Sequence, residues 1–159
     1  MSPEADDAPD VVVPDDASAL EEPVTVALLL TQVVAAEPLA AVCTLAGVRA
    51  VAIGSIAVLE DPTTGPQAAA AVSRLLKGTD LVLCERRAGA IAASRWSLGS
   101  HDEDLAPGLL LDSGPAVLED LLLGDVVPGD LDGVVSSADI SRFKAVRVLT
   151  KIARQARKG

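Results

Sequence analysis

Apolar residues follow two different patterns along the chain, and the change of pattern predicts where helices and strands lie. Residues 26–46 are almost continuously apolar over a length that suits a helix, and Pro38 interrupts them. Because the residue before a proline disfavours the α region, we expect two short helices, or a helix and a turn, with Gly47 as a C-terminal cap. Residues 50–60 are rich in Val and Ile and have no helical period, so they predict one buried strand.

The middle of the chain continues this succession of helices and strands. An Ala-rich run with Pro66 near its first turn and Gly78 at its end predicts a helix. The link through Arg86 and Arg87 is short enough for a hairpin between the strands on either side. The expected elements are a helix at 66–78, strands at 81–85 and 88–94, an exposed loop at 97–108, a strand at 108–112 and a helix at 115–124. This order predicts an α+β fold with a small, mostly antiparallel sheet and helices on one side.

A last helix is predicted at 137–157, where Ser136 and Asp139 resemble a capping box. Its apolar residues recur three and four positions apart on one face: Ala145, Val146, Leu149, Ile152, Ala153 and Ala156. Basic residues occupy much of the rest: Arg142, Lys144, Arg147, Lys151, Arg154 and Arg157. This helix either docks through its apolar face and leaves a solvated charged face, or presents the cations to an acidic partner, an RNA or a membrane surface.

Charge falls into three blocks along the chain. Residues 1–22 hold eight acids and no base, residues 23–135 hold fourteen acids and six bases, and residues 136–159 hold seven bases and one acid. We therefore expect a flexible acidic arm at 1–22 with a short strand at 10–14, an α+β domain at 23–124, a linker at 125–136 and a basic amphipathic helical tail at 137–159. The acidic arm is itself one candidate partner for the basic tail.

Composition narrows the classes of function. The net charge is −10 and only Trp96 and Phe143 are aromatic, so nucleic acid is not expected as a partner except through the basic tail. The apolar half of the chain is too large for a wholly disordered protein. Cys43 and Cys84 lie in apolar sequence and predict buried thiols in a reducing compartment. Without a signal peptide or a membrane-spanning run, we expect a cytoplasmic protein and no membrane partner.

Catalytic chemistry has little support in the sequence. His101 is the single histidine and stands in the acidic run 101–104. A general base needs a nucleophile and an orienting group beside it, and a linear acidic run is more typical of a solvated loop than of a metal site. The glycines form no dinucleotide or phosphate-binding motif. We expect no enzyme activity, no cofactor and no metal.

Residues 50–89 carry an ordered set of motifs: AIGSI at 52–56, a turn glycine at Gly65, an Ala-rich helix containing 68–71, and Lys77 before the next strand. This order resembles the bacterial microcompartment (BMC) shell domain. That domain opens with an A-[IL]-G-x-[IL] strand and continues through a glycine turn and an Ala-rich helix ending in a lysine. A strand that ends near a pore loop follows. Residues 108–123 are similar to the family's closing strand, turn and helix.

The segments at 10–14 and 23–48, which precede these motifs, resemble the circularly permuted shell proteins of ethanolamine and propanediol compartments. The resemblance implies a ferredoxin-like permuted fold and a cyclic homohexamer. Its tiles would contact other shell proteins and encapsulated enzymes, and a central pore would pass small metabolites. Lys77 would lie at the hexamer edge. The pore region would contain Arg86, Arg87, Ala88 and Gly89, and its arginines would form a positive ring or would pair with the acidic loop.

Two other classes of function stay open. A roadblock-type regulatory or scaffolding module, in which a helix, a hairpin and Ala-rich helices form a dimer, shares much of the same element order. A twofold interface across the 50–60 strand would favour it. A factor that binds RNA or acidic partners through the basic tail predicts salt-dependent binding that is lost when 136–159 is deleted.

Overall fold

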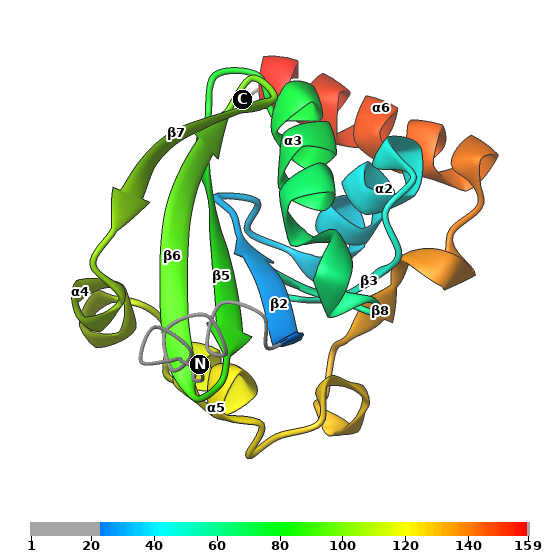
Figure 1. Cartoon of the computed structure of the whole chain (residues 1–159). Helices are drawn as coiled ribbons and strands as arrows, with labels where there is room; N and C mark the ends of the chain where they lie inside the picture. The colour runs from blue at the N-terminus through cyan, green and yellow to red at the C-terminus, as the bar shows by residue number, and fades with distance from the viewer. Residues whose placement is uncertain (1–22, 159) are drawn as a thin grey trace, which may run out of the picture.

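The computed structural model describes residues 23–158, with the backbone alone for 156–158. It contains a seven-stranded antiparallel sheet in the order β7-β6-β5-β2-β4-β3-β8 (Figure 1). The strands are β2 (Val24–Leu30), β3 (Ala50–Ile53), β4 (Ile56–Leu59), β5 (Leu81–Arg87), β6 (Ala90–Ser97), β7 (Ser100–Leu105) and β8 (Val135–Ser136). The helices are α2 (Ala36–Ala46), α3 (Gly65–Leu75), α4 (Pro107–Ser113), α5 (Ala116–Leu123) and α6 (Arg142–Lys158). Three short 3-10 turns are η2 (Pro62–Thr64), η3 (Pro128–Asp130) and η4 (Ser137–Asp139). The predicted arm at 1–22 and its strand at 10–14 lie outside the described residues.

Helices cover both faces of the sheet. Ala27 and Leu29 of β2 belong to the core packed under α2 and α3, whereas Leu28 belongs to a second core that contains residues of α4 and α5. Alternate side chains of one strand therefore serve opposite cores, as the pleat of a strand requires. The α+β class is confirmed. The prediction of a small sheet with helices on one side is wrong, because two hairpins widen the sheet and α5 closes its second face.

The first strand, β2, was not predicted from the sequence because both of its faces are buried. Val24–Leu30 pairs with β4 on one side and β5 on the other, and both of its faces are covered, so its sequence is apolar apart from Thr25 and does not alternate. The helix predicted from residue 26 begins only at Ala36. Pro38 stands in the first turn of α2, where its missing N–H needs no partner, so it does not break the helix. Gly47 ends α2 in the left-handed conformation, as expected.

Three further predictions change in the structure. Residues 50–60 form the hairpin β3–β4 rather than one strand, and Gly54 turns the chain with a φ of 56°. The expected loop at 97–108 contains the edge strand β7, whose backbone pairs with β6 while its charged side chains face solvent. Such charges discourage a further strand from adding to a sheet edge. The expected strand at 108–112 lies in helix α4, which begins at Pro107.

The remaining predicted elements of the central region are present, as α3, β5, β6 and α5. Cys43 and Cys84 are buried in different cores of the sheet and form no disulfide. Burial raises the pKa of each thiol to about 12. Both thiols are therefore protonated near neutral pH and serve as small core residues.

Candidate functional site

Helix α6 is the most strongly charged element of the described chain, and a short anchored turn fixes where it starts. The Ser137 hydroxyl accepts a hydrogen bond from the Ala50 amide at 2.9 Å and donates one to the Val48 carbonyl at 3.0 Å. Thr44 of α2 donates its hydroxyl to the Ser137 carbonyl at 2.9 Å. Ile140 then inserts into the core next to α2. These contacts join the end of the chain to β3 and α2, so α6 leaves from a rigid position.

The cap of α6 lies five residues later than the sequence predicts. The Ser136 hydroxyl accepts from the Ala138 amide and caps the 3-10 turn η4 instead of the helix. The Ser141 hydroxyl accepts from the Lys144 amide at 3.1 Å and caps α6 itself. Helix α6 therefore begins at Arg142 and not at residue 137.

Only a narrow stripe of α6 docks on the domain. Ala145 is fully buried, and Val148 and Leu149 are half-buried against the same core as α2. Val146 and Ile152, which the sequence places on the docking face, are 52% and 37% exposed. Every residue from 151 to 155 is exposed. The first half of α6 is thus seated on α2, and the second half runs along the outside of the molecule (Figure 1).

The solvent-facing side of α6, which we call the α6 face, combines cations with apolar side chains. Five cations with described side chains are exposed: Arg142, Lys144, Arg147, Lys151 and Arg154. Among the described residues, no carboxylate lies within 4.0 Å of any of these five. Phe143 is 74% exposed, and the Arg147 guanidinium lies 5.8 Å from its ring centroid. Val146 adds a second exposed apolar side chain one turn further along.

Cations at the start of α6 oppose the electrostatics of the helix. The N-terminus of a helix carries a partial positive charge, so an exposed cation in the first turn costs about 0.3–1 kcal/mol. Arg142 and Lys144 stand in that turn, which holds no acidic residue. Stability of the fold therefore gives no reason for these two charges. A hollow of about 750 Å³ beside the helix is lined by Glu37 together with Lys144, Arg147, Val148, Lys151 and neighbouring α6 residues.

The candidate pore residues lie together at the turn between β5 and β6. Arg86 donates from Nη1 to the Leu123 carbonyl at 2.9 Å, and the Leu122 carbonyl lies at 3.5 Å, so it caps the C-terminus of α5. Arg87 ends β5, and Ala88 and Gly89 form the turn with positive φ values of 51° and 80°. Arg86 therefore has a structural partner in this fold, and its contact is with α5 rather than with the acidic run.

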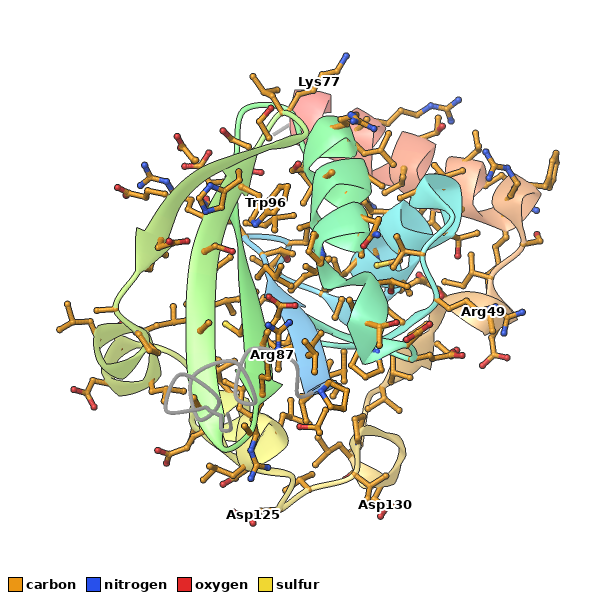
Figure 2. The ribbon with its side chains drawn as sticks, viewed as in Figure 1. Arg49, Lys77, Arg87, Trp96, Asp125 and Asp130 are labelled. Carbon is orange, nitrogen blue, oxygen red and sulfur yellow. The ribbon has the colours of Figure 1, made fainter. Side chains whose placement is uncertain are left out.

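Lys77, the candidate hexamer-edge residue, lies after the C-terminus of α3 and is exposed. In Figure 2 it projects at the opposite end of the molecule from Asp125 and Asp130, and the Arg87 label lies between them. The structure therefore separates the edge candidate from the pore candidates.

The acidic run around His101 forms a self-contained surface network. His101 Nε2 lies 2.9 Å from Asp104 Oδ1, and its ring meets Trp96 edge-on with centroids 5.6 Å apart. Arg95 of β6 contacts the carboxylates of Asp102 and Glu103 at 3.2 and 3.1 Å. Within the described residues, no group of three His, Cys, Asp or Glu side chains is arranged to hold a metal ion. Arg95 and His101 thus hold three carboxylates of the run in contacts within the sheet edge.

Sequence reasoning located the cations of α6 but missed three of its features. The Ser141 cap and the exposure of Phe143 and Val146 follow from where the anchored turn places the helix, and the turn depends on contacts with residues about 90 positions away. The charges opposed to the helix dipole could have been noticed if the helix start had been assigned to Arg142.

Comparison of the chain with protein-family models, with curated proteins and with solved structures found no match. No helix among residues 23–158 is both long and apolar enough to cross a membrane. The α6 face therefore defines the candidate site by its own geometry: an anchored, basic helix that exposes apolar side chains.

Proposed function

We propose that this chain is a non-enzymatic binding module that holds an acidic, aliphatic segment of a partner protein on its α6 face. The observation that carries the proposal is the array of five exposed cations without a carboxylate within 4.0 Å among the described residues. Two of these cations stand in the first turn, against the helix dipole. A charge that weakens its own helix is explained by a partner that neutralises it.

The exposed apolar residues favour a protein partner over nucleic acid. Phosphate contacts use cations and polar groups, whereas Phe143 and Val146 offer apolar surface within the same array. A peptide with alternating acidic and aliphatic residues satisfies both kinds of contact. A membrane surface is disfavoured because an interfacial helix inserts its apolar face, and Ala145, Val148 and Leu149 of that face already pack on the domain.

A direct test uses the full chain and a fluorescein-labelled 16-residue peptide, (Asp-Val-Glu-Ala) repeated four times, followed by fluorescence anisotropy. The site variant combines Arg147→Gln, Lys151→Gln and Arg154→Gln. The control variant has the same charge change at three exposed cations elsewhere, Arg49→Gln, Arg74→Gln and Lys77→Gln. Three exposed ionic contacts contribute about 1–2 kcal/mol together, so we expect the site variant to bind about tenfold more weakly.

The control variant is expected to bind within twofold of the unaltered chain. Equal losses in the two variants would contradict the proposal, since the peptide would then respond only to net charge. Tighter α6-dependent binding of a 16-nucleotide single-stranded RNA than of the peptide would replace it with the RNA-binding alternative.

A shell subunit of a bacterial microcompartment is the second candidate. The order of elements between residues 56 and 87 favours it, although residues 52–56 span a hairpin turn and residues 108–112 are helical where the family has strands. Strand β4, turn η2, helix α3 and strand β5 follow one another in the segment that carries the resemblance, and Lys77 is exposed after α3. In this proposal the chain forms cytoplasmic homohexamers that tile with other shell proteins, contact encapsulated enzymes and pass metabolites through a central pore. Sedimentation velocity of the full chain tests it: a hexamer supports the shell subunit, a dimer supports the roadblock-type module, and a monomer contradicts both.

A further inference from the structure

We infer that the acidic segment 1–22 of this chain docks on the α6 face and competes with outside partners for it. The inference deepens the proposed function and rests on it, because it names the first occupant of the same surface. Residues 1–22 lie outside the described structure, and their sequence, their length and the described surface that would receive them support the docking.

Charge complementarity selects α6 as the receiving surface. Residues 1–22 carry eight acids and no base, and the sequence of α6 carries seven bases and no acid. Three of the six cations at 23–135 already have partners: Arg49 lies 3.8 Å from Glu60, Arg86 caps α5, and Arg95 contacts three carboxylates. Arg74 and Lys77 are exposed but make only a small group of charges beside the seven of α6. Residues 23–135 are net acidic, with fourteen acids and six bases, and would repel the segment. The described surface therefore offers the segment one extended cationic region.

Apolar complementarity points to the same surface. The segment contains an aliphatic run at 11–13 between acidic residues, and Leu20 before Glu21. This is the mixture of acidic and aliphatic side chains that the α6 face is proposed to hold. Phe143 and Val146 are exposed next to Arg147, so aliphatic and acidic groups of the segment have partners within about one turn of α6.

The length of the segment is sufficient to reach α6. Strand β2, which continues from it, begins in the lower half of the view, and α6 runs along the upper right (Figure 1). A domain of this size has a diameter of about 35–40 Å, estimated from its chain length. Twenty-two residues span up to about 70 Å when extended and about 26 Å as a random coil. The segment therefore reaches α6 within the same chain without being fully stretched.

Attachment makes a weak contact effective. A tethered segment acts at an effective concentration of about 1 mM, so an intrinsic dissociation constant near 0.1 mM keeps it bound about 90% of the time. An outside partner must then displace it, and its apparent affinity falls about tenfold. Partner proteins with a higher acidic charge, or with several copies of the acidic–aliphatic segment, would therefore be selected over partners with a single weakly binding segment.

The test repeats the anisotropy titration with the acidic–aliphatic peptide on full-chain variants. The arm variant removes four carboxylates of the segment: Asp6→Asn, Asp7→Asn, Asp15→Asn and Asp16→Asn. The control variant removes four exposed carboxylates of the described domain: Asp112→Asn, Asp125→Asn, Asp130→Asn and Asp132→Asn. Asp125 and Asp130 lie at the end of the molecule opposite α6, so this control matches the charge change without touching the proposed contact (Figure 2).

We expect the arm variant to bind the peptide about tenfold more tightly than the unaltered chain, and the control variant to stay within twofold. Adding the three α6 substitutions to the arm variant should abolish the gain. If the arm variant and the unaltered chain bind equally, and both depend on α6, the inference is overturned and the proposed function stands. If no variant shows α6-dependent binding, the proposed function fails and the inference fails with it. A gain in the arm variant that survives the α6 substitutions would also overturn the inference, because the segment would then act elsewhere.

Discussion

Helix α6 and strand β7 are both exposed and highly charged, but their charges are arranged in different ways. The carboxylates of β7 converge on Arg95, which contacts Asp102 and Glu103, and His101 contacts Asp104. The five described cations of α6 have no carboxylate within 4.0 Å among residues 23–158. The comparison separates charge that is neutralised inside the fold from charge that has no ionic partner among the described residues. Only the second kind supports the proposed binding function.

The test with the largest expected effect disrupts the packing of α6 on the domain. Ala145→Asp places a carboxylate where the side chain is fully buried against the core next to α2. An unpaired buried charge is costly, so we expect a loss of about 3 kcal/mol in the free energy of unfolding, or detachment of α6. Urea denaturation followed by circular dichroism measures it. Ala153→Asp, at an exposed position of the same helix, should change stability by less than about 0.5 kcal/mol.

Arg95→Gln should lower the free energy of unfolding by about 1 kcal/mol more than a comparable substitution on α6 does. The substitution leaves Asp80, Asp102 and Glu103 without their shared cation, and partly exposed ion pairs contribute about 0.2–1 kcal/mol each. Arg147→Gln on α6 removes no ion pair among the described residues, so its stability should remain within about 0.5 kcal/mol. Chemical denaturation at 20 mM and 500 mM NaCl measures the free energy of unfolding of the two variants. A larger loss for Arg147→Gln than for Arg95→Gln would reverse the contrast.

Lys144→Glu should raise stability slightly while it weakens binding. An acid in the first turn of α6 interacts favourably with the helix dipole, and we expect a gain of about 0.5 kcal/mol in the free energy of unfolding. The same change should weaken binding of the acidic–aliphatic peptide, because it reverses a charge of the α6 face. Lys144→Gln should give intermediate values of the free energy of unfolding and of the affinity for the peptide. A substitution that raised stability and left binding unchanged would remove Lys144 from the binding surface.

The smallest effect concerns Glu85, a half-buried carboxylate of β5. Its Oε2 lies so close to Gly65, the first residue of α3, that a Cβ there would come within 2.9 Å of it. Burial raises the pKa of Glu85, although the nearby Arg87 charge opposes this shift. The folded chain then binds this proton more tightly than the unfolded chain does. Stability is reduced above the folded pKa and recovers as the pH falls through it toward the ordinary glutamate value.

Denaturation curves between pH 7.5 and pH 4 therefore test Glu85→Gln against the unaltered chain. The variant should gain stability relative to the unaltered chain at pH 7.5, and the difference should shrink as the pH falls. Asp61 behaves in the opposite direction, because hydrogen bonds from Thr63 lower its pKa, and it serves as a reference in the variant Asp61→Asn. A difference for Glu85→Gln that grew at low pH would contradict the assigned direction.

Local sequence patterns correctly predicted the elements whose ends and hydrophobic periodicity are determined by nearby residues. Helix α3 has Pro66 in its first turn, α2 and α5 end at left-handed glycines, and β5 and β6 are joined by a two-residue turn. The basic residues of α6 were also identified from the sequence. Two other elements were missed: the mostly apolar β2 depends on cores on both of its faces, and the acidic β7 pairs with the adjacent β6 through backbone contacts that its charged side chains do not indicate. The start of α6 depends on Ser137, whose partners are nearly 90 residues away.

The pairing of β8 with β3 also sets an order of assembly during synthesis. Val51 and Ala52 of β3 lie opposite Ser136 and Val135, so this side of the sheet is closed by residues made more than 80 positions later. Until they emerge, the growing chain presents the open edge of a hydrophobic hairpin, which is the kind of surface that recruits strands from other chains. A chain that stops before Val135 keeps that edge open permanently. The C-terminal part of the protein thus covers the edge of β3 in the folded domain as well as carrying the charged helix.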